Sequence, residues 1–241
     1  MRRGIAAAVL AFAGAALAQP ADIAPFSPAA AGGALPGEWK ARRVGRVPPA
    51  EVALVADDVT VLEVKSRAAA GAATHALNAD VSARPMLSWR WKIDRVIEAA
   101  DFERRAGDDF AARVYVFFDV PESALGFAAR IKLRLARLVY GEELPTAGIC
   151  YVWDNRHTAG TSAWSPYTDR IRIVVAESGA GRAGQWVGER RDLEADFRAA
   201  FGAQWKGAVP AVTGVALGND SDQTGESATA RFGDLRLEAR P

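Results

Sequence analysis

The sequence predicts an all-β protein, a two-sheet sandwich of jelly-roll type with two short helices. Three observations favour this fold. Apolar residues recur at every second position in about ten short runs, and turn-forming residues separate these runs. The chain has 241 residues but a single Cys, so its stability must come from a hydrophobic core rather than from disulfide bonds.

Each strand is predicted where apolar and polar residues alternate between turn signals. The predicted strands are 38–44, 51–56, 60–66, 74–81, 87–93, 109–119, 149–155, 170–176, 214–219 and 228–238. In the fifth run Trp89 and Trp91 share an apolar face, whereas Arg90 and Lys92 share the opposite one. We therefore expect both tryptophans in the core and both cations on an outer face.

Two segments break the alternation with helical spacing. In 123–140 the apolar residues recur every three or four positions and arginines line another face, which favours either a helix lying on the sandwich or a surface that binds a membrane or a partner. The second segment begins at Asp192, a suitable N-cap, and ends at Gly202. We expect this second helix to be structural.

The N-terminus has the features of an export signal. A basic start precedes an apolar, Ala-rich stretch, and the small residues Ala16 and Ala18 fit a signal peptidase site. We expect residues 1–18 to be removed, 19–37 to form an extended lead, and 38–241 to form one domain. The protein is then periplasmic or secreted, and after cleavage no segment is long and apolar enough to span a membrane.

Composition excludes several classes of function. A formal net charge of +1 argues against a protein held on nucleic acid by phosphate contacts. There are two histidines, and no GxSxG, HExxH, CxxC or P-loop motif occurs. His157 lies near Asp154 and Ser162 in sequence, which leaves open a His-based site or an exposed loop histidine. Cys150 follows an apolar residue in a predicted strand, so we expect a buried thiol.

Five segments carry a resemblance to a known family. They are LSWRWKID (87–94), DDFAARVYVFFD (108–119), ICYVWDN (149–155), ERRDLEADFRAAFG (189–202) and VTGVALGNDSDQTGESATARFGDLRL (212–237). As an ordered set they resemble a bacterial family known as domain of unknown function 3047, which has no established activity. The opening segment and the closing FGDLRL strand are also similar to galactose-binding-like jelly rolls, a fold common among carbohydrate-binding modules.

Alternation places a set of polar residues on the faces opposite the apolar ones. If their strands adjoin in one sheet, they form a cationic strip that could hold an acidic polysaccharide through arginine–carboxylate contacts. The alternative is a solvated face with cross-strand ion pairs. The candidate ligand-binding residues are Arg90, Lys92, Arg113, Tyr115, Asp119, Asp154, Arg170 and Arg172.

The segment 219–226 alternates oxygen-bearing side chains between two predicted strands. Asp220, Asp222, Thr224 and Glu226 could direct several oxygens at one structural Ca²⁺, although a hairpin rich in turn formers explains the same residues.

The sequence thus favours a non-catalytic, exported module that binds a polysaccharide or glycan of the cell envelope. Two alternatives remain. One is a glycan hydrolase that pairs Asp119 with Asp154 or Glu189. The other is an envelope assembly factor that binds a polypeptide through the helix at 123–140.

Overall fold

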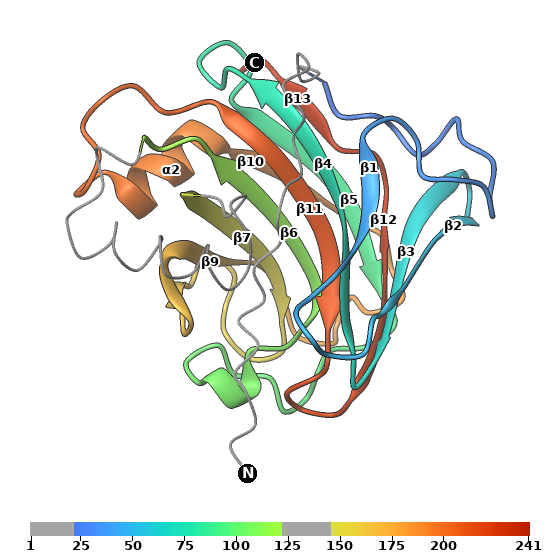
Figure 1. The fold of residues 1–241 in the computed structure, drawn as a ribbon. Helices are drawn as coiled ribbons and strands as arrows, with labels where there is room; N and C mark the ends of the chain where they lie inside the picture. The colour runs from blue at the N-terminus through green and yellow to red at the C-terminus, as the bar shows by residue number, and fades with distance from the viewer. Residues whose placement is uncertain (1–21, 122–145) are drawn as a thin grey trace.

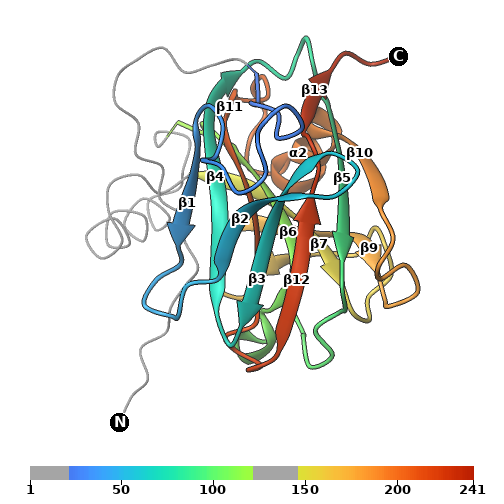
Figure 2. The same ribbon diagram turned by 90° about the vertical axis from the view of Figure 1, so that its right-hand side faces the viewer.

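A computed structural model describes residues 22–121 and 146–241, which form two β-sheets packed face to face (Figures 1 and 2). The predicted signal peptide and the predicted helix at 123–140 lie outside the described residues. The first sheet has seven strands, in the order β1 (Trp39–Arg43), β4 (Ala70–Ala79), β11 (Val212–Asp220), β6 (Phe110–Phe118), β7 (Ala147–Asp154), β9 (Thr168–Ser178) and β8 (Ser162–Ser165).

The second sheet has six strands. Its order is β10 (Val187–Asp192), β5 (Met86–Ile93), β12 (Ser227–Phe232), β3 (Thr60–Arg67) and β2 (Glu51–Ala56), with β13 (Arg236–Glu238) pairing β5 beyond this path. All pairings are antiparallel except that of β7 with β9. The predicted two-sheet sandwich is confirmed. Alternation did not reveal β8 and β10, and the last predicted strand is divided into β12 and β13.

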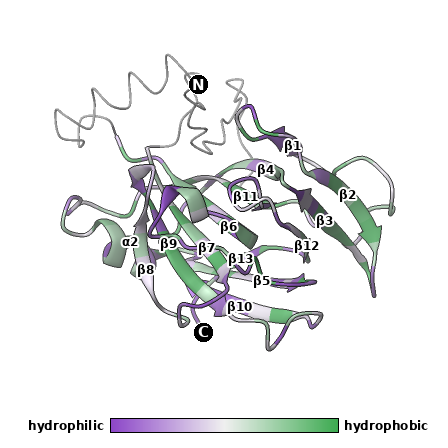
Figure 3. Cartoon of the chain, turned by 90° about the horizontal axis from the view of Figure 1, so that it is seen from below, coloured by the Kyte–Doolittle hydropathy of each residue, from purple (hydrophilic) through white to green (hydrophobic). Residues whose placement is uncertain are grey.

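The main core lies between the sheets and is rich in aromatic residues. Trp89 and Trp91 are buried there as expected, and their rings contact Tyr151 and Trp153 at centroid distances of 5.3 and 5.7 Å. Large aromatic side chains bury much apolar area at a low cost in conformational entropy. Figure 3 shows that β6, β7 and β9 are hydrophobic along much of their length.

A second apolar cluster lies on the other face of the seven-stranded sheet. It includes Tyr115 and Phe117, whose rings stack at 5.6 Å, and the free thiol of Cys150, which is buried as expected. Every residue of β6 and β7 is consequently buried, although alternation predicted one buried face for each strand.

Helix α2 (Leu193–Phe201) confirms the second predicted helix. The carboxylate of Asp192 accepts a hydrogen bond from the backbone N–H of Ala195 at 3.0 Å, which satisfies a donor that the helix itself leaves free. Phe197 and Phe201 then face the core at one end of the sheets, and the short 3-10 helix η1 (Arg105–Gly107) lies at the opposite end (Figure 1).

The lead segment packs on the sandwich without regular structure from residue 22 to the start of β1. The backbone N–H of Ala24 donates to Nε2 of buried His75 at 3.1 Å, and Trp39 donates its indole N–H to the Ala24 carbonyl at 2.8 Å. The N–H of Phe26 donates to the carboxylate of Asp234 at 2.7 Å, which ties the lead to the last turn of the chain.

A buried amide connects the two sheets. Asn219 belongs to β11, and its Nδ2 donates to the backbone carbonyls of Val64 in β3 and Ala228 in β12, each at 3.0 Å. Both hydrogens of this amide are thus paired, whereas its Oδ1 has no hydrogen-bond partner among the described residues. Asn219 therefore fixes the spacing of the sheets at this point.

In the part of the chain that the structure describes, no helix has the length and apolar character that a membrane span requires.

Candidate functional site

The outer face of the six-stranded sheet carries a cluster of charged side chains around one tryptophan. We define this basic face as Lys65, Arg90, Lys92, Arg231, Asp57, Glu63 and Trp186. The guanidinium carbon of Arg90 lies 4.4 Å from the Trp186 ring centroid, and Nζ of Lys92 lies 4.8 Å from it. Even with Glu51, which lies opposite Lys65 on β2, the four cations of the basic face outnumber the carboxylates.

Asp57, in the turn between β2 and β3, organises this face. Its carboxylate accepts hydrogen bonds from Lys92 at 2.6 Å, Arg231 at 2.8 Å and the Trp186 indole N–H at 3.3 Å. The hydrogen bond from Lys92, reinforced by Arg231, holds the pKa of Asp57 far below its ordinary value. Asp57 is therefore a fixed negative charge that orients the indole and both cations.

Strand register explains why the charges gather here. Lys92 of β5 lies opposite Arg231 of β12, and Arg231 lies opposite Glu63 of β3. The Arg231 guanidinium consequently bridges Glu63 at 2.7 Å and Asp57 at 2.8 Å. Such cross-strand pairs stabilise the sheet modestly, and they leave Lys92 and Arg231 with acidic partners.

Arg90 differs from its neighbours. Among the described residues it has no carboxylate within ion-pair distance, and its contact is the face of the half-buried Trp186 ring. Gly233 gives its side chain room, because a Cβ at that position would lie 2.7 Å from Cγ of Arg90. The guanidinium of Arg90 is thus positioned by sterics and stacking while its N–H groups can bind an external anion.

The structure does not bring the predicted cationic strip together, because its strands lie in different sheets. Arg90 and Lys92 lie on β5, whereas Arg113 and Tyr115 lie on β6 of the other sheet. Arg113 is only 4% exposed and pairs with Asp220 through two hydrogen bonds, of 2.8 and 2.6 Å. The expectation that Arg113 lies on a solvated face is wrong, since the second apolar cluster covers that face.

Arg170 and Arg172 lie on a third strand, β9. Arg170 donates to the side chain of Gln204 at 2.8 Å. Arg172 donates to the Ser162 hydroxyl at 2.8 Å, and its guanidinium carbon lies 5.1 Å from the Trp164 ring centroid. Arg170 therefore contacts the segment after helix α2, and Arg172 contacts the edge strand β8.

The acidic residues proposed for hydrolysis are far apart. Asp119 follows the end of β6 that pairs with Ala147, whereas Asp154 ends β7 seven residues further along. At about 3.3 Å per residue their separation is about 20 Å, beyond the roughly 5–10 Å that paired catalytic carboxylates require. Glu189 lies on β10 in the other sheet, and burial raises its pKa. The structure therefore gives no support to a pairing with Asp119.

Asp154 has a local role instead. Its carboxylate is fully buried and accepts hydrogen bonds from the backbone N–H of Arg156 at 2.9 Å and from the backbone of His157. It also lies 3.0 Å from Nδ1 of the His157 ring, which packs against Phe102 at a centroid distance of 4.1 Å. Among the described residues, no Ser or Cys side chain forms a hydrogen bond with the His157 ring. The Asp154–His157 pair thus stabilises a turn.

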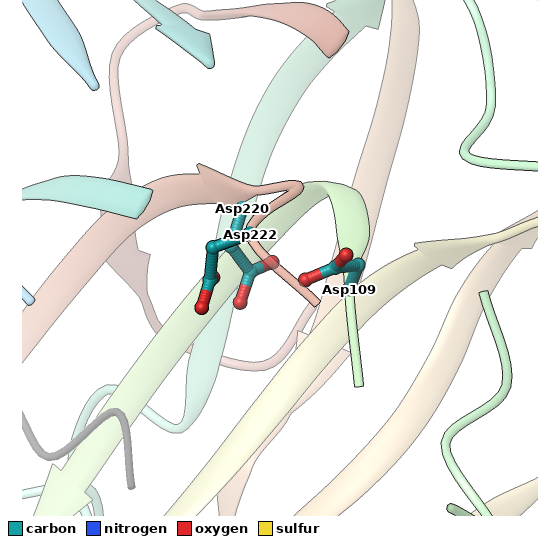
Figure 4. A group of neighbouring side chains, drawn as sticks. All are labelled: Asp109, Asp220 and Asp222. Carbon is teal, nitrogen blue, oxygen red and sulfur yellow. The ribbon is translucent and has the colours of Figure 1, made fainter. Parts of the chain in front are cut away.

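The residues predicted to bind calcium are only partly brought together. Asp220 and Asp222 lie close to Asp109, a residue not expected at this site, and each offers a carboxylate oxygen within 4.8 Å of the others (Figure 4). Glu226 instead accepts hydrogen bonds from the backbone of Glu98 and Ala99, at 3.1 and 2.9 Å. The segment is not a hairpin either, because it crosses from β11 in one sheet to β12 in the other.

Sequence reasoning missed Trp186, and it did not place Asp109 beside Asp220 and Asp222. Trp186 follows the glycine-rich loop GAGRAGQ, outside any run that alternates, and immediately precedes β10. The feature that could have identified Trp186 is a large aromatic side chain in a segment that otherwise has small and polar residues. Asp109 was placed at the start of a strand, and its proximity to Asp220 depends on the pairing of β6 with β11.

Three comparisons relate the chain to known proteins. Solved structures with a similar arrangement include the xyloglucanase domain of NopAA, a type three effector from Sinorhizobium fredii in complex with cellobiose (8% identity, 89% of this chain and 97% of that chain, TM-score 0.48). Others are a family 12 xyloglucanase from Bacillus licheniformis (9%, 85% and 100%, TM-score 0.41) and endoglucanase cel12A from Rhodothermus marinus (13%, 85% and 97%, TM-score 0.42).

At these identities and TM-scores the likenesses say nothing about ligand or activity. None of the curated proteins compared with the chain matches it. The model of a family described as a protein of unknown function, DUF3047, matches residues 38–236, which include all five segments that carried the resemblance except the final residue of the last one. Because this match spans most of the sequence, the chain belongs to the DUF3047 family.

Proposed function

We propose that the protein is an exported, non-catalytic module that binds an acidic polysaccharide through the basic face. One observation carries this proposal: Arg90 is held against the half-buried Trp186 ring and has no acidic partner among the described residues. A guanidinium matches the geometry of a carboxylate, and the Trp186 ring holds this guanidinium in place. Uronic acid polymers carry such carboxylates.

The internal ion pairs of the basic face also support binding, because they order the surface around Arg90. Asp57 holds Lys92 and the indole in place, so the contact surface is ordered before a ligand arrives. The surplus of cations over carboxylates attracts a polyanion, and salt would screen this attraction. Neutral glycans lack the carboxylates that Arg90 would recognise, so affinity is expected to depend on the charge of the polymer.

Isothermal titration with sodium polygalacturonate, and with dextran as the neutral comparison, tests the proposal. Arg90→Ala is expected to weaken binding about tenfold, corresponding to the loss of one charge-assisted contact of about 1.4 kcal/mol. Trp186→Ala is expected to weaken it as well. Gly233→Ala should have a similar effect to Arg90→Ala, because the added Cβ displaces the Arg90 side chain.

Arg172→Ala is the matched control, since it removes an arginine over a tryptophan on the other sheet. Its affinity should stay within twofold of the native value. Equal binding of dextran and polygalacturonate would contradict the proposal, as would native affinity in Arg90→Ala.

Export is the second part of the proposal, and it rests on the sequence of residues 1–18. N-terminal sequencing of the protein from the periplasm or the medium is expected to begin at Gln19. Protein that stays in the cytoplasm with Met1 retained would contradict it.

A further inference from the structure

The junction between β12 and β13 is a β-bulge that lies beside Arg90. Both strands pair with β5, and Figure 2 shows β13 beyond the end of β12. The pairing of β12 ends at Trp91, and that of β13 begins at Ser88. Three residues, 233–235, therefore lie opposite two residues of β5, Arg90 and Trp89. We call residues 233–235 the bulge. A β-bulge leaves one residue without a ladder partner and re-aims side chains near it.

Gly233 is the residue of the bulge that contacts Arg90. Its backbone N–H donates to the Arg90 carbonyl at 2.9 Å. A Cβ at Gly233 would lie 2.7 Å from Cγ and 2.9 Å from Nε of Arg90, so the glycine backbone lies directly against this side chain. The guanidinium carbon also lies 4.4 Å from the Trp186 ring centroid. Both the bulge and the indole consequently position Arg90.

The next residue of the bulge, Asp234, binds the lead segment. Its carboxylate accepts hydrogen bonds from the backbone N–H groups of Phe26 and Ser27, at 2.7 and 3.0 Å, and from the Ser27 hydroxyl at 2.7 Å. A nitrogen of Arg236 lies 4.0 Å from this carboxylate, which is beyond hydrogen-bond distance. Among the described residues, the lead therefore supplies all the hydrogen bonds that the Asp234 carboxylate receives.

Burial of Phe26 holds the lead in place. Its side chain is fully buried in the main core, and its ring centroid lies 4.8 Å from that of Trp39. Burial of a large aromatic side chain contributes strongly to docking. The N–H of the same residue donates to Asp234, so docking of the lead and restraint of the bulge occur together.

We propose that the docked lead positions the basic face: through Asp234 it holds the bulge against Arg90, and so it controls the affinity for the acidic polysaccharide. The ligand in this inference rests on the proposed function. Leu235 is buried and fixes the far end of the bulge, so Asp234 restrains the part next to Gly233. When the binding-competent form is only partly populated, the affinity falls by that fraction. Release of the lead therefore weakens binding although every residue of the basic face is still present.

An NMR signal of Arg90 tests the positioning without any glycan. The Trp186 ring shifts the Nε–H signal of Arg90 in the native protein, because the guanidinium is stacked on it. In Asp234→Ala this signal is expected to move toward the position of an unstacked arginine. The Arg90→Ala protein identifies the signal by its absence.

Titration with sodium polygalacturonate gives the second readout. Asp234→Ala is expected to weaken binding by up to about tenfold, the full effect of Arg90→Ala, because it acts through Arg90. The double variant should bind like Arg90→Ala alone, since a positioning residue then has no side chain left to position. A variant that only lowered the stability of the fold would leave the affinity of the folded protein unchanged.

Two further variants serve as controls. Asp234→Asn is the conservative one, because its amide oxygen can still accept the two backbone hydrogen bonds, and both readouts should stay close to native. Asp22→Asn is the matched control within the lead. It removes an exposed carboxylate that pairs with Arg84 rather than with the bulge, and it should change neither readout.

Ser27→Ala covers the case in which Asp234→Ala does not fold. It removes one of the three hydrogen bonds and should move both readouts in the same direction by a smaller amount.

Two results would overturn the proposal. One is a native Arg90 signal in Asp234→Ala, or in Ser27→Ala if only that variant folds. The other is a pair of affinity losses, from Asp234→Ala and Arg90→Ala, that add in the double variant. Failure of the proposed function looks different. If native protein does not bind polygalacturonate but the Arg90 signal still moves in Asp234→Ala, the polysaccharide is wrong and the positioning by the lead is supported.

Discussion

His75 makes the stability of the protein depend on pH in a way that can be calculated. Its ring is 1% exposed, and Nε2 accepts a hydrogen bond from Ala24, so the neutral imidazole is the form that fits. Burial lowers the pKa of His75 from 6.5 to about 4, with a small opposing effect from Glu38. Protonation would turn the Nε2 acceptor into a donor facing another donor.

The sign follows from linkage between protonation and folding. Because the pKa is lower in the folded state, the contribution of His75 is fully present above pH 6.5 and is lost as the pH falls toward 4. One pKa unit corresponds to about 1.4 kcal/mol, so the total loss approaches about 3 kcal/mol. By pH 5 the unfolding free energy should have fallen by about 2 kcal/mol from this residue.

Urea unfolding of the native protein and of His75→Gln, between pH 7.5 and 5, measures this contribution. The glutamine cannot titrate in this range, so its unfolding free energy should decline less than that of the native protein, by about 2 kcal/mol. Carboxylates with lowered pKa values contribute equally to both proteins and cancel. Parallel pH dependences would refute the reasoning, as would an NMR titration of the His75 ring with a midpoint near 6.5.

Three further predictions concern buried polar groups. Arg113→Met should cost about 3–5 kcal/mol by leaving Asp220 unpaired, and adding Asp220→Asn should recover part of this loss; additive effects in the double-mutant cycle, measured by urea unfolding, would exclude the pairing. Asn219→Ala should cost about 2 kcal/mol for its two hydrogen bonds between the sheets, and a loss below about 0.5 kcal/mol would count against that role. Burial raises the pKa of the Cys150 thiol to about 12, so Ellman's reagent should modify it only in denaturant; rapid reaction of the native protein would disprove this.

Alternation along single strands predicted much of the fold. It placed Trp89 and Trp91 inside and Arg90 and Lys92 outside, because these positions depend on the two-residue period of one strand. It failed for Arg113, whose strand is buried on both faces. The aromatic side chains of Tyr115 and Phe117 on the same face as Arg113 were the available signal that this face is covered.

The candidate sites were harder to predict, because they depend on which strands adjoin. Arg90 and Arg113 occupy equivalent positions in their own strands but lie in different sheets. Asp109 and Asp220 are far apart in sequence and meet through the pairing of β6 with β11. Such pairing results from long-range packing, which a local pattern does not record.

The positions of β11 and β12 determine when the chain can fold. β11 lies between β4 and β6, and β12 lies between β3 and β5, so the last 30 residues of the chain supply an interior strand to each sheet. A chain whose C-terminal part is still being synthesised or translocated has two incomplete sheets with unpaired interior edges. Folding to the native state must therefore wait until β11 and β12 are available to pair.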